Sequence, residues 1–272
     1  MASFTTHKDV FAGVTVNSIE NRELIEGRSL AEADKLVKDE LDRFIREGAR
    51  LVWFNIDLKH SLLVQVLSKL EFEFHHAREQ NVTMVRWLAT SELNNIPIYP
   101  FTSVGVGCLV VDSAGRLLLM KERRGNYKGW KFPGGTVDPG SHLFDAAARE
   151  AQEETGVSVV AESVLTFRHQ TTFKWAGTSD LYFICVCRPL DETTAHAEST
   201  SEASDIRWFD RATLRTLPLA EFHTFHWDVV HKYDALTAQK REGIVPEDFT
   251  IPEWRNRSWK MYFERLKEPE KL

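Results

Sequence analysis

The fold is decided by residues 135–157, which run Gly135-Thr-Val-Asp-Pro-Gly-Ser-His-Leu-Phe-Asp-Ala-Ala-Ala-Arg-Glu-Ala-Gln-Glu-Glu-Thr-Gly-Val157. Pro139 and Gly140 are turn residues, Ser141 is the expected N-cap, and Gly156 is the expected left-handed residue that ends a helix. Between them, apolar side chains recur at i, i+3, i+4 and i+7, namely Phe144, Ala147, Ala148 and Ala151. This spacing predicts a loop followed by a helix with one buried face.

Three carboxylates lie outside that apolar stripe. Glu150, Glu153 and Glu154 are spaced i, i+3, i+4, so they project from one face of the helix within about one turn. Each pair of like charges at i,i+4 destabilises a helix by a few tenths of a kcal/mol, unless a divalent cation binds between them. Hard oxygen ligands suit Mg²⁺ or Mn²⁺. The alternative is a solvated acidic face, which is the commoner origin of three such residues taken alone.

The complete pattern decides between these interpretations. Residues 135–157 resemble the Nudix box, G-x5-E-x7-R-E-U-x-E-E-x-G-U, in which U is a bulky aliphatic residue. The matching positions are Gly135, Arg149, Glu150, Glu153, Glu154, Gly156 and Val157. Two positions depart, because Ser141 stands at the first glutamate and Ala151 at the first U. The preceding segment, residues 130–135 (WKFPGG), is also family-like, and the chain is identified as a member of the Nudix hydrolases.

The resemblance implies a set of site residues. Its metal ligands are Glu150, Glu154, Glu153 and the backbone carbonyl of Gly135, with Mg²⁺ or Mn²⁺ as the cofactor. It gives catalytic roles to Glu153, Glu150 and Arg149. Glu202 lies six residues before Trp208, where some Nudix enzymes bring a further carboxylate from a loop, although an ordinary surface glutamate fits this solvated loop equally well. Interacting carboxylates titrate as a group, so no single base is assigned.

The serine at position 141 bears on activity. In the family, the first box glutamate mostly orients the box arginine, so its loss need not remove the metal site. Asp145 lies four residues before Arg149 and Glu153 four residues after it, which offers an i,i+4 ion-pair ladder instead. We therefore expect an active pyrophosphohydrolase. The alternative is a catalytically weak Nudix-fold protein that binds a ligand or regulates a partner.

Candidate substrate-binding residues precede the box. They are Arg123, Arg124, Trp130 and Phe132. Arginine pairs with phosphate through two hydrogen bonds and stacks on rings, although solvent exposure alone also explains charged residues in a loop. The subgroup that this chain resembles, which includes plant ADP-ribose/NADH pyrophosphatases, implies a nucleoside diphosphate derivative, with ADP-ribose or NADH favoured. Capped RNA stays an option, but the net charge of −6 argues against a general nucleic-acid binder.

The length of 272 residues fits two modest domains. Helix patterns at residues 30–45 and 61–70 alternate with strand patterns at 14–17, 51–56, 72–75 and 84–88, and a proline-punctuated linker follows at 94–100. We expect a smaller α/β domain over 1–97, a Nudix α/β/α sandwich with a mixed sheet over 98–218, and a helical extension over 219–272. Within the sandwich, residues 104–111 and 116–121 have the pattern of a hairpin.

The resemblance extends to the first domain. This first domain is similar to the extra amino-terminal domain of one Nudix subgroup, a domain that looks like part of an acetyltransferase fold. In this chain we expect it to serve as a substrate-access or homodimer-forming module. The pair His75-His76 is expected at a strand edge rather than at a metal. Three cysteines in apolar runs indicate reduced thiols. No signal peptide or membrane span is visible, so a cytoplasmic protein with nuclear access is the default.

Overall fold

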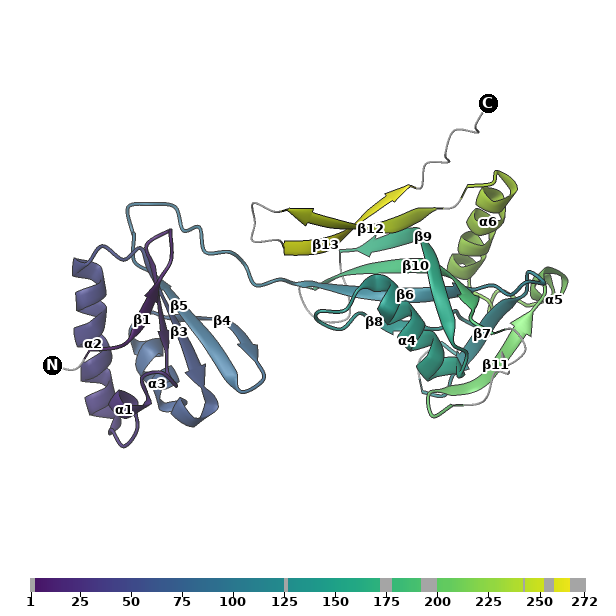
Figure 1. The fold of residues 1–272 in the computed structure, drawn as a ribbon. Coiled ribbons are helices and arrows are strands. Elements are labelled where there is room, and N and C mark those ends of the chain that lie inside the picture. Colours follow the sequence, from purple (N-terminus) through teal and green to yellow (C-terminus); the bar gives the residue numbers. More distant parts are fainter. Residues whose placement is uncertain are drawn as a thin grey trace, which may run out of the picture. The chain divides into compact units, whose positions relative to one another are not determined.

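The computed structural model describes residues 3–124, 127–171, 178–191, 200–241, 243–251 and 257–264. The chain forms two compact units, Met1–Pro100 and Phe101–Leu272 (Figure 1). Each unit has its own hydrophobic core, one in the first unit and two in the second. Within the described ranges, no helix combines the length and the apolar character that a bilayer crossing requires.

The first unit is an α/β domain built on a five-stranded sheet of order β1-β2-β3-β5-β4. β2 and β3 are parallel, and the other neighbouring strands are antiparallel. The strands are β1 Thr6–Lys8, β2 Gly13–Asn17, β3 Leu51–Asp57, β4 Glu73–Arg78 and β5 Asn81–Trp87. The helices are α1 Arg22–Ile25, α2 Leu30–Arg46, the 3-10 helix η1 Leu58–His60, and α3 Leu62–Lys69.

Local sequence signals explain these elements. The side chain of Ser29 accepts a hydrogen bond from the backbone of Glu32, and the Glu32 side chain accepts one from the backbone of Ser29, so a capping box starts α2. The chain leaves α2 at Gly48, which has a positive φ of +80°. His75 and His76 lie on β4, the edge strand, in agreement with the prediction.

The second unit contains a six-stranded mixed sheet of order β13-β12-β9-β10-β6-β8 and a two-stranded sheet of β11 and β7. β6 and β10 are parallel, and the other described pairings are antiparallel. The strands are β6 Thr102–Val110, β7 Leu117–Glu122, β8 Gly134–Thr136, β9 Val159–Gln170, β10 Ser179–Pro189, β11 Ala203–Phe209, β12 Ile244–Ile251 and β13 Arg257–Glu264. The helices are α4 Leu143–Thr155, α5 Arg211–Arg215 and α6 Thr224–Ala238.

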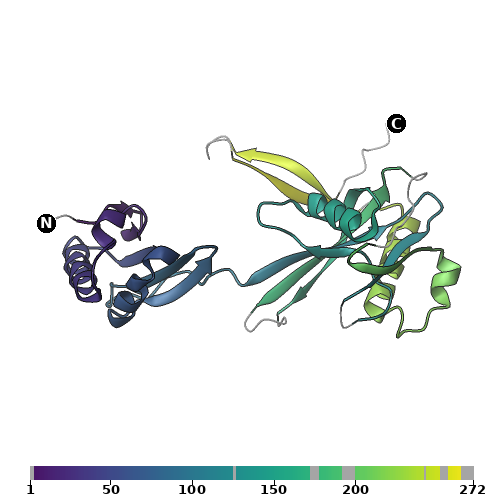
Figure 2. The same cartoon turned by 90° about the horizontal axis from the view of Figure 1, so that it is seen from below.

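The central strands of this sheet are buried on both faces. Alternate residues of β6 and β10 point to opposite sides. Val106, Cys108, Cys185 and Cys187 pack with α4, whereas Leu109, Val111, Ile184 and Val186 pack with α6. Figure 2 shows α4 lying across the sheet. The predicted α/β/α sandwich with a mixed sheet is therefore confirmed. The three cysteines are free and buried.

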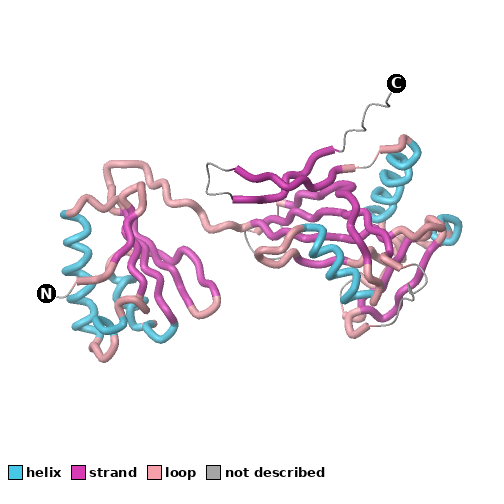
Figure 3. Tube along the Cα trace, in the orientation of Figure 1, coloured by secondary structure: helices cyan, strands magenta, loops and turns pink. Residues whose placement is uncertain are grey.

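Two expectations about this unit need correction. The predicted hairpin is confirmed only next to its turn, where Val111 and Leu117 form one antiparallel bridge and the Asp112 N–H donates to the carbonyl of Arg116. Beyond this bridge the two arms separate, because β6 pairs with β10 and β8, and β7 pairs with β11. The extension after residue 218 is only partly helical, since α6 is followed by the strands β12 and β13 (Figure 3). Tyr262 of β13 packs against Phe144 of α4, with ring centroids 6.0 Å apart.

Candidate active site

Helix α4 begins directly after a turn and ends at a glycine. The backbone N–H of Ser141 donates to the carbonyl of Asp138, with Pro139 and Gly140 (φ +86°) at the turn centre, as in a type II turn. The N-cap is His142, so the expectation of Ser141 is wrong by one residue. Gly156 ends the helix with φ +72°, as predicted. Ser141 is exposed in the turn.

Two of the three box glutamates are buried against a glycine strand. Glu150 and Glu154 are 9% and 5% exposed. A Cβ atom on Gly135 would lie 2.6 Å from both carboxylate oxygens of Glu150, so a larger residue there would force this carboxylate to move. The N–H of Gly134 donates to Glu154 Oε2 at 2.6 Å. The box spacing thus brings Glu150, Glu154 and Gly135 together.

Burial changes the acidity of both carboxyl groups. It raises the pKa of Glu154 to about 7, because desolvation outweighs the nearby Lys131 charge and the Gly134 hydrogen bond. Glu150 and Glu202 raise the Glu154 pKa further by repulsion. Burial also raises the pKa of Glu150, against the opposing effect of Arg149. Burial therefore favours the protonated form of both carboxyl groups, and a further positive charge beside them would favour the ionised form.

These residues fit a divalent cation. Mg²⁺ is commonly held by one or two carboxylates, and water and substrate phosphate complete its shell. Glu150 and Glu154 supply two hard oxygen donors whose proximity is unfavourable without a cation. Among the described residues no group of three or more His, Cys, Asp or Glu side chains forms a preassembled metal cage. Two carboxylates leave the remaining positions of the shell to water, to the Gly135 carbonyl and to substrate phosphate.

Arg149 is partly exposed and forms ion pairs with three carboxylates at the edge of the site. Its guanidinium contacts Glu150 Oε1 at 2.9 Å, Glu153 Oε2 at 2.8 Å and Asp138 Oδ2 at 3.2 Å. It also donates to the carbonyl of Thr136 at 3.0 Å. The Glu153 half of the predicted ladder is confirmed. The Asp145 half is wrong, since Asp138 from the preceding turn makes the further ion pair found among the described residues.

Glu153 is placed differently from its two neighbours. Its side chain is 53% exposed and its described ion-pair partner is Arg149. A carboxylate in this position orients the arginine, which in turn contacts Glu150. The structure therefore separates the three box glutamates into a buried pair and an outer residue.

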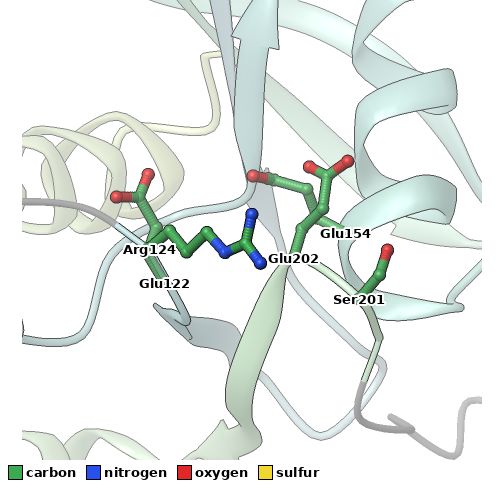
Figure 4. A pocket seen from close by; sticks show the side chains of 5 residues that line it. All are labelled: Glu122, Arg124, Glu154, Ser201 and Glu202. Atoms are coloured by element: carbon green, nitrogen blue, oxygen red, sulfur yellow. The ribbon is translucent and has the colours of Figure 1, made fainter.

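Glu202 lies in a pocket of about 440 Å³ beside Glu154. The pocket is lined by Glu122, Arg124, Glu154, Ser201 and Glu202, and Figure 4 shows the Arg124 guanidinium extending toward Glu154 and Glu202. Residues 200–202 are held by two hydrogen bonds. Thr200 Oγ1 donates to the carbonyl of Glu154 at 3.0 Å, and the backbone N–H of Arg123 donates to the carbonyl of Glu202 at 2.8 Å. The β7–β11 pairing thus brings Arg124 and Glu202 to one opening.

The remaining candidate residues have other surroundings. Arg123 donates to the carbonyls of Thr200 and Ala203, so it supports the loop that carries Glu202. Trp130 is 3% exposed and packs on Phe209 in the core, with the Lys121 ammonium 4.9 Å from its ring centroid. Phe132 is also largely buried but lines a second pocket. Of the four predicted substrate-binding residues, Arg124 lines the pocket of Glu202.

Sequence reasoning missed three residues of the site. Lys131 bonds Glu122 and approaches Glu154 Oε1 at 3.9 Å. Asp138 pairs with Arg149. Lys131 stands inside the WKFPGG segment and Asp138 inside the box, but neither occupies a fixed motif position. Glu122 becomes part of the site only through the pairing of β7 with β11.

The fold and the site together define a hydrolase with an acidic helix facing a glycine strand. Residues 101–233 match the family described as NUDIX domain, and residues 4–88 match one described as Nudix hydrolase domain. Nucleoside diphosphate-linked moiety X motif 6 of Homo sapiens is 30% identical, over 96% of this chain and 81% of its own length. Nudix hydrolase 2 of Arabidopsis thaliana is 28% identical, over 80% of this chain and 78% of its own length.

A solved Nudix hydrolase from Nitrosomonas europaea is 20% identical, with a TM-score of 0.43, over 64% of this chain and 90% of that chain. The match to the human relative carries the assignment, and the chain belongs to the Nudix hydrolase family. The resemblance noted from the sequence is thereby confirmed. The protein is a pyrophosphohydrolase of nucleoside diphosphate derivatives, in a family that generally uses divalent metal ions.

Proposed function

We propose that this enzyme hydrolyses the diphosphate linkage of ADP-ribose or NADH in a reaction that depends on Mg²⁺ or Mn²⁺. The metal dependence is supported by the buried pair Glu150 and Glu154, whose pKa values are raised and which lie against the glycine strand β8. A pair of this kind is costly in a bare protein and favourable around a cation. The choice of substrate is supported by the resemblance to the plant ADP-ribose/NADH pyrophosphatases.

Diphosphate hydrolysis requires a water oxygen to attack phosphorus while the bridging P–O bond breaks. The barrier comes from negative charge, so positioning and electrostatics supply most of the catalysis. Glu150, Glu154 and the Gly135 carbonyl would hold the cation. When bound, it would neutralise the phosphates and make a coordinated water more acidic.

The other residues take the proton and orient the groups. Glu202, which lines the pocket, would accept a proton from the attacking water. Arg124 in the same pocket is suited to the diphosphate oxygens, because its guanidinium can donate two parallel hydrogen bonds. Arg149 fixes the Glu150 carboxylate, and Glu153 with Asp138 fixes Arg149.

A substrate panel tests this proposal. Product chromatography would compare ADP-ribose, NADH, NAD⁺, CoA, diadenosine polyphosphates, nucleoside triphosphates and capped RNA, each with Mg²⁺ and with Mn²⁺. We expect the highest kcat/KM for ADP-ribose or NADH, and loss of turnover in Glu154→Gln but not in the surface variant Glu162→Gln. Equal turnover in Glu154→Gln and wild type would refute the site assignment. A preference for another substrate would refute only the choice of substrate.

A further inference from the structure

A pocket of about 710 Å³ lies at the carboxyl-terminal end of α6. Its walls come from β9, from the end of β10, from the last turns of α6 and from the start of β12. Its apolar floor includes Leu165 and Val186, which pack with α6 rather than with α4. The pocket shares no lining residue with the pocket of Glu202. Its volume is in the range of pockets that hold a small organic molecule.

The charged lining of this pocket is mainly positive. Arg188, Lys240 and Arg241 line it, and among the described lining residues Glu162 is the only acidic one. The whole chain has a net charge of −6, so this local excess of cations runs against the composition. Guanidinium and ammonium groups that converge on one opening bind anionic groups such as phosphate. The pocket is therefore suited to an anion.

Arg188 is held in the pocket by three hydrogen bonds. Its Nε donates to Glu162 Oε2 at 3.2 Å, its Nη1 to the carbonyl of Val111 at 3.1 Å, and its Nη2 to the Tyr233 hydroxyl at 3.1 Å. A guanidinium has five N–H donors, so these three contacts leave two donors. A cation that is already held loses less conformational freedom on binding than a mobile one. Arg188 is thus preorganised for an anionic ligand.

Lys240 occupies a backbone position that favours glycine. Its φ is +55°, in the left-handed region. The Lys240 N–H donates to the carbonyl of Thr237 and the Arg241 N–H to that of Leu236, both at 3.0 Å, which is the hydrogen-bond pattern of a Schellman motif. Helices most often carry glycine at this place, because a side chain there costs free energy. Within the described ranges Arg241 pairs with Glu264, whereas no ion pair involves Lys240.

A lysine near the end of a helix has an ordinary explanation, because cations are favoured at the negative end of the helix dipole. That explanation accounts for the charge of Lys240 but not for its left-handed backbone, since the next residue, Arg241, already supplies a cation. Backbone strain of this kind is concentrated at functional sites. Lys240 therefore indicates a ligand in addition to a role in ending the helix.

We propose that this pocket binds an organic phosphate of about the size of a mononucleotide, with the phosphate on Lys240, Arg241 and Arg188 and the body of the molecule on the apolar floor. A phosphate monoester presents three strong acceptor oxygens, which suits three cations. Inorganic phosphate would leave the floor uncovered, and an apolar ligand would leave the cations without a partner. The site uses none of the carboxylates of the hydrolytic site, so it goes beyond the proposed function.

Calorimetric titration in EDTA tests the pocket. The probes are AMP, phenyl phosphate and ribose 5-phosphate, with inorganic phosphate as the probe that lacks a body. Lys240→Gln removes the ammonium, and Lys240→Arg keeps a positive charge. Lys232→Gln is the matched control, since Lys232 is an exposed lysine of α6 outside the pocket lining. Glu154→Gln changes the carboxylate site alone.

We expect at least one organic phosphate to bind wild type about tenfold more tightly than inorganic phosphate. Lys240→Gln should weaken its binding by about tenfold, because a hydrogen bond to a charged group is lost, and the other three variants should retain it. If no organic phosphate outbinds inorganic phosphate, or if Lys240→Gln binds as wild type does, the proposal is overturned. Binding that falls in Glu154→Gln but not in Lys240→Gln would place the ligand at the carboxylate site and overturn it as well.

A stability measurement separates a ligand role from a structural one. Lys240→Gly removes the ammonium and relieves the left-handed strain, so we expect its melting temperature to rise by about 2–4 °C while its binding falls as in Lys240→Gln. A lower melting temperature with unchanged binding would show a lysine that serves the helix alone, and would overturn the proposal. Binding that depends on Lys240, in a protein with no turnover on ADP-ribose or NADH, would support the pocket and contradict only the proposed reaction.

Discussion

The two units of this chain each bury a glutamate on a helix, and they surround it differently. Glu40 of α2 is 6% exposed and accepts hydrogen bonds from the Arg43 guanidinium at 2.6 Å and from the Phe4 N–H at 3.0 Å. Glu154 of α4 is 5% exposed and accepts the Gly134 N–H, but its ion-pair contact with Lys131 is 3.9 Å long. Lys131 is also bonded to Glu122.

The difference separates a structural carboxylate from a functional one. A buried charge with a close arginine is neutralised inside the fold, whereas a buried charge short of partners raises the free energy of the bare protein. Such a cost persists where the group has another task. The same residue type, on the same kind of helix, therefore supports folding in the first unit, and under the proposed function it would hold a cation in the second.

Removing the functional carboxylate should have the largest effect. Glu154→Gln keeps the shape of the side chain but removes its charge, and we expect kcat on the best substrate to fall by at least about 10²-fold, because a cation ligand is lost. Glu40→Gln should leave kcat unchanged. Steady-state kinetics on both purified variants checks this contrast, and equal losses of kcat in the two would contradict it.

The stability effects should run in the opposite direction. Glu40→Gln removes the negative charge closest to Arg43 but keeps an acceptor oxygen, and we expect the free energy of unfolding to fall by about 2 kcal/mol, less than for a fully buried pair because Arg43 is partly exposed. Glu154→Gln should leave the metal-free protein as stable or more stable at pH 8. Urea denaturation in EDTA measures both. Adding Arg43→Met to Glu40→Gln should recover part of the loss, and a further full loss would count against the pairing.

The pH dependence follows from the Glu154 pKa. Its value is about 7 in the folded protein and 4.5 in the unfolded chain, so the folded state holds an additional proton between these values. The free energy of unfolding of the metal-free protein should therefore fall as the pH rises from 4.5 to 7, by up to about 3 kcal/mol from this group. Denaturation in EDTA at pH 5 and pH 8 measures the change, which Glu154→Gln should reduce.

Metal should reverse this trend. Because a cation must displace the Glu154 proton, Mg²⁺ should raise the melting temperature more at pH 8 than at pH 6. Melting curves of wild type and Glu154→Gln, with and without Mg²⁺, provide the check. An equal Mg²⁺ effect at both values in wild type would mean that Glu154 does not bind the ion.

The smallest expected effect concerns Asp138, which pairs with Arg149 in this chain, where Ser141 replaces the box glutamate that orients the arginine in the family. Asp138→Asn removes an exposed ion pair with Arg149, and we expect kcat to fall about two- to fivefold, in line with the strength of surface pairs. Asp145→Asn, an exposed change in the first turn of the same helix, should have no effect. Adding Ser141→Glu to Asp138→Asn should restore activity. Identical kinetics for Asp138→Asn and Asp145→Asn would remove Asp138 from the account.

Much of this structure follows from local sequence signals. The capping box at Ser29, the glycine stop at Gly156 and the box spacing place the helices and the buried carboxylates, because these signals act within one or two turns. The two-face alternation in β6 and β10 follows in the same way from apolar runs. Family membership and the hydrolase class were likewise accessible from the motif.

The rest depends on contacts distant in sequence. The pairing of β7 with β11, which brings Arg124 to Glu202, could not be inferred, since a tight turn favours the neighbouring strand as partner. The same is true of Asp138 replacing Asp145, because a turn conformation decides which carboxylate reaches Arg149. Dimer formation and cytoplasmic location stay predictions.

The central claim is that Glu150 and Glu154 form the cation site, with Glu153 outside it. Titration of Mn²⁺ into the protein, followed by electron paramagnetic resonance at pH 7.5, tests this most directly. Wild type should bind the ion, Glu150→Gln and Glu154→Gln should each weaken binding by about tenfold or more, and Glu153→Gln should retain it. Wild-type affinity in Glu154→Gln, or loss of binding only in Glu153→Gln, would contradict the account.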